Sequence, residues 1–368
     1  MPDVYVHASY LAGAIYAAMV LFLLAGFLRS RPRLSNGARP KVSVVVPARN
    51  EAANLQSCLQ ALVAQSYPRD LIEIVVVNDR SHDATGEIAR RFQAQHSNLF
   101  AVEVTETPTG VSPKKYALSQ GIARAGGELV FTTDADCAPP REWLAQMVPL
   151  FSERVGLVMG AAPFHERPHW LARLLALDNL ASTFVAVGGC GWNIGVTCTG
   201  RNLAYRKAVF NQVNGFRAIN HSLSGDDDLF MQLVKKRTDW RISFSLSPET
   251  AVPSPSARTV KDFVRQRRRH VSAGKYYSRG VQVAYLVFNL ANLTLFAFLF
   301  VALFTGSQVR PALSLFLSKV GLDFVALFCV AKRLRKMHLL LHFPLWQIFH
   351  LINQVVISPL GFVGRIRW

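Results

Sequence analysis

The chain has 368 residues, of which 51% are hydrophobic and 17% charged, and its formal net charge is +18. This length allows one or two domains, and so apolar a composition predicts that part of the chain lies in lipid. Much of the basic excess lies beside apolar stretches, where it sets membrane topology and attracts anionic headgroups, so nucleic acid is not an expected partner. The five cysteines show no zinc or disulfide spacing and are expected to be reduced, buried thiols.

Residues 1–28 are predicted to form an N-terminal transmembrane anchor. Within them, residues 8–28 carry no charge, and about 20 apolar residues are enough to span a bilayer. The first ten residues contain no Lys or Arg, whereas a cleaved signal peptide begins with basic residues, so the anchor is expected to be retained. Residues 29–40 follow as a basic linker, and the positive-inside rule therefore places the next domain in the cytoplasm.

Residues 41–258 are predicted to form a doubly wound α/β domain, with a mostly parallel sheet and helices on both faces. Short buried strands are expected at 42–46, 73–77, 100–104 and 129–133, and helices at 52–65, 84–95 and 114–124. In such sheets ligands bind beyond the carboxyl ends of the strands. Three polar segments fall at such ends and are expected to converge on one cleft: Pro47 to Glu51, Asn78 to Ser81, and Asp134 to Asp136.

Asp134 and Asp136 lie one residue apart at the end of the fourth predicted strand. Residues i and i+2 of a strand face the same side, so the two carboxylates can converge on one cation. Carboxylate oxygens favour Mg2+ or Mn2+ over zinc, and such a cation suggests a diphosphate as its other ligand. The alternative is that the two aspartates cap a helix that begins near Arg141.

Neither a dinucleotide-binding motif nor a P-loop is expected, because no Gly-x-Gly-x-x-Gly follows the first strand and no Walker lysine motif is present. Asp79 could instead accept a hydrogen bond from a base or a ribose, and Lys114 could meet the charge of a phosphate. Asp79 could equally be a turn residue, and Lys114 a solvated residue at a helix start.

Three consecutive acids, Asp226, Asp227 and Asp228, lie at the start of a helix predicted to run to Lys236. The helix dipole stabilises negative charge there, and like charges packed together raise the pKa of at least one carboxyl group. A carboxylate with a raised pKa is a suitable general base, so this triplet is a candidate catalytic site. Capping of the helix is the alternative.

Residues 259–280 are predicted to form a juxtamembrane helix that carries the segment Gln266 to His270, Gln-Arg-Arg-Arg-His. This segment is either a basic flank of the membrane or a cationic clamp on a diphosphate leaving group.

Residues 281–368 are predicted to form a membrane region with two spans, near 280–309 and 311–331. A last apolar segment, 337–364, is interfacial, re-entrant or a third span that would leave Arg365 and Arg367 outside. Lys319 and Asp323 lie four residues apart in the second of these spans and are expected to pair with each other or to face protein.

The order of these motifs over residues 41–280 resembles the inverting family 2 glycosyltransferases with the GT-A fold, which include the cellulose and hyaluronan synthases. The resemblance rests on Pro47 to Glu51, Asn78 to Ser81, Lys114 to Leu118, Asp134 to Asp136, Thr199 to Arg206, Gly225 to Asp227, and Gln266 to His270. Each motif is common by itself, whereas seven in this order are specific. The resemblance implies transfer of a sugar, with inversion, from a nucleoside-diphosphate donor, most commonly a UDP-sugar.

The resemblance also implies roles for individual residues. Contacts to the nucleotide of the donor would come from Pro47, Arg49, Glu51, Asp79, Lys114 and Asp134. Asp136, with Asp134, would hold the Mg2+ or Mn2+ between the phosphates. Asp227 would be the general base, although the triplet also permits a register in which Asp226 is the base. Arg269 with Gln266 would hold the departing nucleoside diphosphate. The acceptor side would include Gly200, Arg201, Asn202 and His270.

Two features depart from the processive members of that family and argue against a polymerase. The motif Gln-x-x-Arg-Trp ends in His270, and few spans are present. The expected acceptor is instead a membrane-associated lipid, because the juxtamembrane helix and the last apolar segment would hold the cleft against the bilayer. The protein is expected in the inner or plasma membrane, if bacterial, with its catalytic domain cytoplasmic. Two alternatives are a membrane-anchored, metal-dependent nucleotidyl or phosphoryl transferase and a non-catalytic nucleotide-sugar-binding scaffold.

Overall fold

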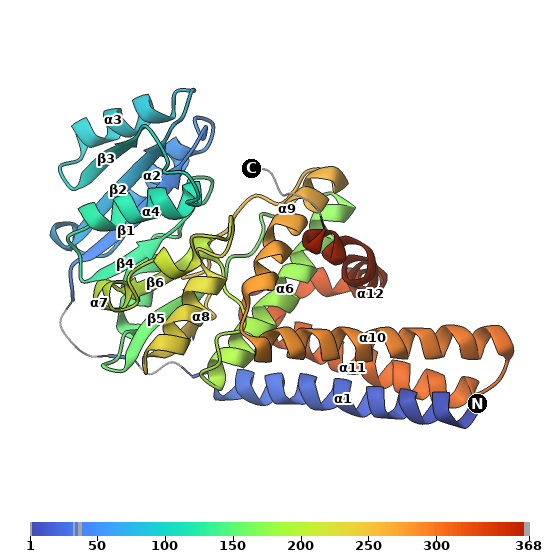
Figure 1. Ribbon diagram of the computed structural model, residues 1–368. Coiled ribbons are helices and arrows are strands. Elements are labelled where there is room, and N and C mark those ends of the chain that lie inside the picture. Colours follow the sequence, from blue (N-terminus) through green and yellow to red (C-terminus); the bar gives the residue numbers. More distant parts are fainter. Residues whose placement is uncertain (1, 32–33, 36–38, 364–368) are drawn as a thin grey trace.

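The computed structural model describes residues 2–31, 34–35 and 39–363 (Figure 1). An α/β domain lies at one end of the molecule and a bundle of long helices at the other. Part of the predicted linker 29–40 lies outside the described residues, as do Arg365 and Arg367.

One seven-stranded sheet forms the centre of the α/β domain, in the order β3-β2-β1-β4-β6-β5-β7. Neighbouring strands are parallel except at β6, which is antiparallel to both β4 and β5. The strands are β1 (Val42–Ala48), β2 (Ile72–Asp79), β3 (Leu99–Val104), β4 (Leu129–Thr132), β5 (Val155–Gly160), β6 (Leu203–Arg206) and β7 (Arg241–Ser245). The four predicted strands and the mostly parallel sheet are confirmed.

Helices cover both faces of this sheet, because alternate residues of each strand are apolar and point to opposite sides. Val45 and Val77 pack with α4 (Pro113–Arg124) on one face. Val44 and Val76 pack on the other face with α2 (Leu55–Val63), α3 (Thr85–Gln95) and α5 (Trp143–Met147). The three predicted helices are therefore present, and the doubly wound fold class is confirmed.

Three long apolar helices pack together and project away from the α/β domain: α1 (Pro2–Arg29), α10 (Arg279–Thr305) and α11 (Val309–Arg333) (Figure 1). Each is long and apolar enough to cross a membrane. Large apolar side chains on their outer faces are exposed, among them Phe300 and Phe304 of α10, at 72% and 85%. Lipid stabilises such a surface, so the three helices fit the three predicted spans.

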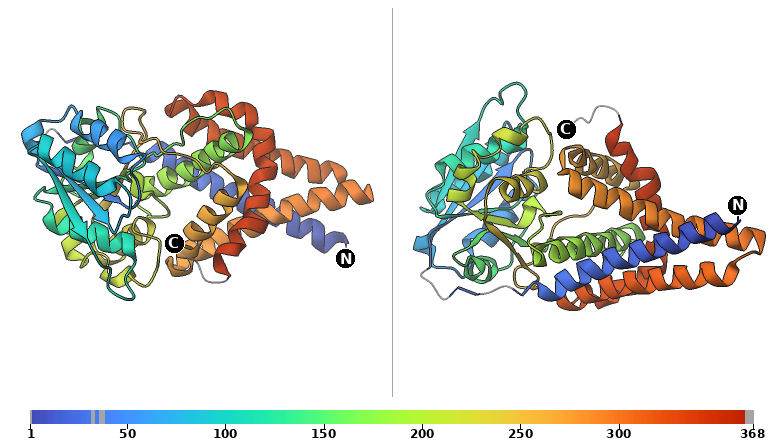
Figure 2. Two further views of the ribbon diagram at one scale, coloured as in Figure 1. Left: turned by 90° about the horizontal axis from the view of Figure 1, so that it is seen from above. Right: turned by 60° about the horizontal axis from the view of Figure 1, so that its bottom comes forward.

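The last apolar segment, Met337–Phe362, is helical but irregular, and its regular part is α12 (Phe343–Ile352). It packs on α6 (Trp170–Gly191) and ends beside α9 (Val260–Ser272), and in Figure 2 it runs across the direction of α10 and α11. The segment is also long and apolar enough to cross a membrane. Its interfacial placement stays a prediction.

Helix α6 was not predicted, although it is a further candidate span and the one most buried inside the molecule, at 72%. It crosses α1 near the α/β domain (Figure 1), and glycines of both helices lie at the crossing. A Cβ added to Gly26 of α1 would lie 2.0 Å from the carbonyl oxygen of Gly188. The two backbones are therefore in direct contact, as small residues allow at helix crossings in membranes.

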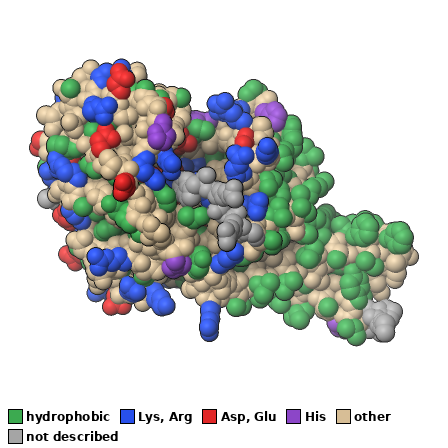
Figure 3. Space-filling model, turned by 45° about the horizontal axis from the view of Figure 1, so that its top comes forward, with side chains coloured by type: hydrophobic (Ala, Val, Ile, Leu, Met, Phe, Trp, Pro, Cys, Tyr) green, Lys and Arg blue, Asp and Glu red, His purple; other side chains and the backbone are tan. Residues whose placement is uncertain are grey.

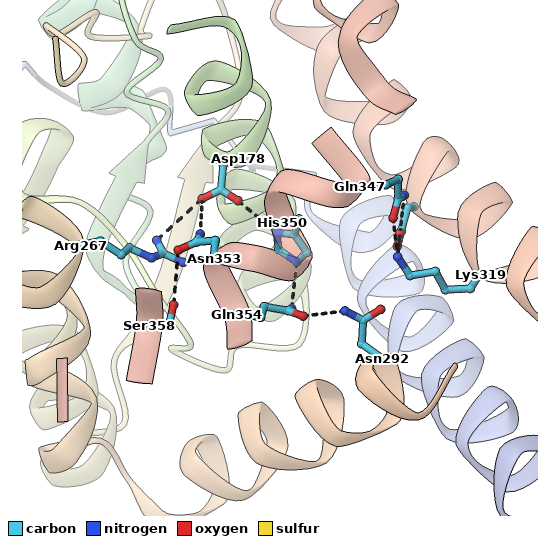
Figure 4. Close-up of polar contacts among 10 residues, drawn as sticks. Asp178, Arg267, Asn292, Lys319, Gln347, His350, Asn353, Gln354 and Ser358 are labelled. Carbon is cyan, nitrogen blue, oxygen red and sulfur yellow. Dashed lines mark hydrogen bonds and ion pairs between the residues drawn. The ribbon is translucent and has the colours of Figure 1, made fainter. Parts of the chain in front are cut away.

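The predicted pairing of Lys319 with Asp323 is confirmed, at 2.8 Å within α11. Gln347 of α12 contacts both side chains, and its amide lies 2.8 Å from Asp323 Oδ2 (Figure 4). The hydroxyl of Tyr16 on α1 donates to the other oxygen of Asp323. These charges are thus paired and hydrogen-bonded inside the bundle, as buried charges require.

Candidate active site

One cavity of about 1560 Å3 lies between the carboxyl edge of the sheet and the helices of the bundle. The three polar segments predicted to converge all contribute to its wall, through Glu51, Asp79 and Asp136 among others. Asp227 of the acid triplet and His270 of α9 line the same cavity. Figure 3 shows Lys and Arg side chains gathered where the α/β domain meets the apolar surface of the helices.

The loops after β1 and β2 form the sheet end of the cavity and hold strained backbone. Asn50 and Arg80 have positive φ angles, 55° and 53°, which residues other than glycine rarely adopt. The loops are tied to each other, because the Asn50 N–H donates to Ser81 Oγ at 3.0 Å and the His82 N–H donates to Asn50 Oδ1 at 2.9 Å. Strained backbone that surrounding hydrogen bonds hold in place is typical of functional sites.

Four residues predicted to contact the nucleotide lie at these strand ends. Arg49 and Glu51 are in the loop after β1, whereas Pro47 is near the end of β1 and Asp79 is the last residue of β2. Asp79 is buried, and its carboxylate accepts from the Arg80 guanidinium at 2.7 Å. Burial raises the pKa of Glu51, and the carboxylates of Asp136 and Asp134 add to this, although a hydrogen bond from Asn54 opposes it. The sheet end therefore holds several acidic groups close together.

Lys114 of α4 joins the two acidic motifs into one site. Its ammonium nitrogen lies 2.8 Å from Asp134 Oδ1 and 3.1 Å from Asp226 Oδ2. Burial alone would lower the pKa of Lys114, but the two carboxylates outweigh it and raise the pKa. Burial likewise opposes ionisation of Asp134, yet Lys114, Arg201 and Arg269 keep the pKa of Asp134 below its usual value. Lys114 and Asp134 are therefore both charged at neutral pH.

Asp136 fits the predicted role of a ligand for a divalent cation. Its carboxylate lines the cavity and accepts a 3.4 Å hydrogen bond from the Cys137 thiol. Burial and the adjacent charge of Asp134 raise the pKa of Asp136. A bound cation would stabilise the ionised carboxylate and so oppose this shift. No group of three His, Cys, Asp or Glu residues within the described part of the chain could hold a metal by itself. Phosphate oxygens and water would therefore supply the remaining ligands.

The same finding bears on a two-metal nucleotidyl or phosphoryl transferase. Such a site needs a third acidic residue beside Asp134 and Asp136, and the described residues provide no cluster of three metal-ligating side chains.

Asp227 is both the cap of α8 (Asp228–Arg237) and part of the cavity wall. Its Oδ1 accepts from the Asp228 N–H at 2.7 Å and its Oδ2 from the Gly200 N–H at 2.9 Å. Burial, with the neighbouring carboxylates of Asp228 and Asp226, nevertheless raises the pKa of Asp227 to about 7. This carboxyl group therefore exchanges its proton near neutral pH, as a general base requires.

Helix α9 brings Gln266, Arg269 and His270 to the same cavity. The helix begins at Thr259, whose side chain accepts from the Asp262 N–H at 3.1 Å. Arg269 lies near enough to Asp134 to lower the pKa of that carboxyl group. The surrounding protein and the charge of Arg269 also lower the pKa of His270, so its imidazole is neutral at pH 7.

Of the four predicted acceptor-side residues, Gly200, Arg201 and His270 line the cavity, but Asn202 does not. Asn202 is instead completely buried. Its amide donates to the carbonyl oxygens of Ala161 and Thr250, and its carbonyl accepts from the Trp143 indole at 2.9 Å. Asn202 thus holds three segments of the domain together.

Lys115 and Tyr277 support the acid triplet and were not predicted. The Lys115 ammonium is completely buried and donates to the carbonyl oxygens of Ile219, Ser222 and Ser224, which fixes the loop before the triplet. The Tyr277 hydroxyl donates to the Asp228 carboxylate. In the sequence only the adjacency of Lys115 to Lys114 could have pointed to it, because its partners lie about a hundred residues away.

Comparisons with known proteins agree with this geometry. Residues 43–222 match the model of glycosyl transferase family 2. The chain is 30% identical over 231 residues to the glycosyltransferase AglE of Haloferax volcanii, an alignment that covers 62% of this chain and 71% of that protein. The chain therefore belongs to glycosyl transferase family 2. The predicted class of enzyme, a family 2 glycosyltransferase of EC 2.4, is thereby confirmed.

Two further relatives match less of their own length. The probable glycosyltransferase YdaM of Bacillus subtilis is 29% identical over 269 residues, which is 70% of this chain and 62% of YdaM. The beta-monoglucosyldiacylglycerol synthase of Trichormus variabilis is 26% identical over 260 residues, which is 68% of this chain and 53% of that protein. The chain thus spans less than two thirds of either relative.

A solved structure has the same fold over almost the whole chain. The mannosyltransferase PcManGT of Pyrobaculum calidifontis, in complex with GDP-Man and Mn2+, covers 95% of this chain and 99% of its own, with a TM-score of 0.59 and 21% identity. The predicted GT-A fold is confirmed, whereas a narrower relation to the cellulose and hyaluronan synthases stays a prediction.

Proposed function

We propose that this protein is an inverting glycosyltransferase that moves a sugar from a nucleoside-diphosphate-sugar, a UDP-sugar by preference, to a hydroxyl group of a membrane-associated lipid. The observation that carries the proposal is the single cavity in which Lys114 joins Asp134 at the sheet end to Asp226 at the acid triplet. The donor site and the general base must lie close together, because the attacking oxygen and the leaving diphosphate lie on opposite sides of one carbon atom.

The donor lies at the sheet end in this proposal. The carboxyl ends of β1 and β2 and the loop after β1 carry Pro47, Arg49, Glu51 and Asp79, and ligands bind at such strand ends in open α/β sheets. Contacts from Lys114 and Asp134 complete the nucleotide site. Mg2+ or Mn2+ held by Asp136 with Asp134 would supply positive charge to the diphosphate.

Asp227 is the proposed general base. It takes the proton of the acceptor hydroxyl while that oxygen attacks the anomeric carbon on the face opposite the diphosphate, which inverts the configuration. The bond from the anomeric carbon to the diphosphate breaks, and its electron pair leaves with the nucleoside diphosphate. Gln266 and Arg269 hold that leaving group. The raised pKa of Asp227 supports this role over that of Asp226, whose carboxylate faces Lys114.

The proposed location is the bacterial inner membrane or a plasma membrane, with the α/β domain in the cytoplasm. Support comes from the basic residues at the domain end of the spans, because Arg29 ends α1, Arg279 begins α10 and Arg333 ends α11.

A lipid acceptor is supported by the course of the cavity, which continues from the acid triplet to residues of α1, α10 and α12. A distant relative, the beta-monoglucosyldiacylglycerol synthase, is named for a product that is a glycolipid.

The test is transfer of radiolabel to lipid. The purified full chain is incubated with labelled nucleotide sugars, Mn2+ or Mg2+ and a bacterial lipid extract, and the organic phase is counted. The proposal expects label in the organic phase, loss of that label in EDTA, and release of a nucleoside diphosphate. Release of pyrophosphate would identify a nucleotidyl transferase instead, and label found only on soluble acceptors would contradict the lipid acceptor.

A further inference from the structure

The membrane side of the cavity is large enough to hold a second ligand beside the donor. Small-molecule sites measure about 300–1,000 Å3, whereas this cavity measures about 1560 Å3. Beyond the acid triplet its wall is formed by apolar side chains of three helices, including Leu23 of α1, Phe184 of α6 and Phe288 of α10. This part of the cavity therefore suits a hydrocarbon chain.

The cavity also reaches the surface that faces lipid in the proposed membrane arrangement. Phe22 of α1 and Leu286 of α10 contribute to its wall, although 46% and 58% of these residues remain exposed. Apolar residues that line the cavity and are also exposed on the spanning helices would let a lipid chain enter from the bilayer without passing through water.

A polar network interrupts this apolar wall (Figure 4). Asp178 of α6 accepts from the His350 ring of α12 at 3.1 Å, and the other ring nitrogen of His350 lies 2.9 Å from the Gln354 amide nitrogen. Gln354 in turn accepts from Asn292 of α10 at 2.5 Å. Because the Gln354 amide nitrogen can only donate, His350 accepts there and donates to Asp178. Asp178, His350 and Gln354 all line the cavity.

Charged side chains are distributed unevenly along the cavity, with most of the cations on the sheet side. On the sheet side the cations Lys114, Arg201 and Arg269 lie close enough to Asp134 to act on its charge. On the membrane side, Arg267 is the one Lys or Arg residue among the described residues that line the wall, and its guanidinium lies 3.8 Å from the Asp178 carboxylate. The carboxylates there include Asp178 and Asp228 of the triplet.

Resting on the proposed function, we infer that the acceptor is an uncharged lipid alcohol, whose headgroup lies against Asp178, His350 and Gln354 and whose chain lies between α1, α6 and α10. The oxygen of a hydroxyl group can accept from the Gln354 amide, which His350 and Asp178 hold in place, so that its proton remains available to Asp227. A lipid phosphate would instead place a further anion beside the carboxylates of Asp178 and Asp228. Arg267 faces Asp178 at 3.8 Å, and its buried Nε, which has no hydrogen-bond partner among the described residues, can donate to the oxygen of an alcohol.

The charge of the acceptor is tested with defined probes. The full chain, in vesicles of phosphatidylcholine with Mn2+ and labelled nucleotide sugars, receives either dioleoylglycerol, a C20 isoprenoid alcohol or undecaprenyl phosphate at equal mole fraction. We expect labelled lipid that an anion exchanger does not retain, formed from one of the two alcohols. Labelled lipid that the exchanger retains, formed from undecaprenyl phosphate, overturns the inference and the hydroxyl acceptor, but leaves sugar transfer to a membrane lipid intact. Label found only on soluble acceptors overturns both.

The location of the headgroup is tested with two variants. Gln354→Leu removes the amide that faces the hydroxyl group, and Asp178→Asn weakens the hydrogen bond that holds His350 beside this amide. We expect each variant to raise the KM for the lipid alcohol about tenfold and to change the KM for the donor by no more than about twofold. Thr294→Val on α10 is the matched control, because the Thr294 hydroxyl bonds to the Leu290 carbonyl of its own helix and, within the described part of the chain, to no other group. Equal changes in both KM values, or an unchanged KM for the alcohol in a folded Gln354→Leu protein, overturn the assignment.

Discussion

One ammonium group connects the residues on which the proposed chemistry depends. Asp134 and Asp226 lie 92 positions apart in the chain, yet Lys114 contacts both carboxylates within 3.1 Å. An Asp-x-Asp pair or an acid triplet alone has common structural explanations, and Asp227 indeed caps its helix. A capping role does not require both motifs to contact the same lysine in one cavity, so this contact favours a functional role.

The first prediction at this scale concerns the base. Asp227→Asn keeps the size and the capping oxygen of the side chain but cannot take a proton. We expect kcat to fall by about 10²- to 10⁴-fold, the usual contribution of a general base, with donor affinity unchanged. Donor binding by calorimetry and turnover by release of nucleoside diphosphate measure the two effects. If Asp226→Asn alone abolishes turnover, the base is Asp226.

A second prediction follows from the raised pKa of Asp227, about 7. The base must be ionised, so kcat should rise with pH through about 7. The folded protein holds this proton more tightly than the unfolded chain, whose carboxyl group titrates near 3.8, so this residue lowers the free energy of unfolding as pH rises from about 4 to 7. Chemical denaturation of wild type and Asp227→Asn across this range should show that difference, and equal pH dependence of the two would contradict it.

The third prediction concerns the cation. Asp136→Ala removes a carboxylate whose pKa is raised by burial and by Asp134, so the variant should lose the stabilisation that Mn2+ gives to donor binding in a thermal-shift assay. EDTA should abolish turnover of the wild type, and added Mn2+ should restore it. Turnover that persists in EDTA would remove the cation from the account.

At the scale of elements, the strands and helices of the first half of the domain were predictable because their apolar residues repeat with clear periods. Helix α6 was not, since Arg173 and Asp178 interrupt its apolar run and it lies between stretches typical of an α/β domain. The partners of Asp178 on α12 lie more than 170 residues away, which no local pattern indicates. For the same reason the buried roles of Lys115 and Asn202 became visible only in the structure.

The crossing of α1 and α6 gives a prediction of its own. A Cβ at Gly188 would lie 2.7 Å from the Leu23 carbonyl oxygen, whereas one at Gly321 of α11 meets no atom within 4 Å. Gly188→Val should therefore lower thermal stability in detergent, by a free energy of about 1–3 kcal/mol or more. Gly321→Val is the control and should remain close to wild type. Equal melting temperatures for the two variants would show that the helices separate at little cost.

For the molecule as a whole, the sequence predicted the order of spans, domain and juxtamembrane helix, because apolar length and basic flanks are local properties. The predicted roles of most site residues came from the resemblance to a family, and all of these residues except the buried Asn202 line the shared cavity. What neither source could supply is the continuation of the catalytic cavity between the helices. That continuation is a property of packing between segments from both ends of the chain.

The arrangement of donor, base and acceptor path is tested most directly by a structure of the full chain with Mn2+ and a non-hydrolysable nucleotide sugar. The account predicts an anomalous peak from manganese between Asp136 and the diphosphate. It also predicts an anomeric carbon that faces Asp227 and the membrane side of the cavity. A metal bound elsewhere, or a sugar that points away from Asp227, would contradict it.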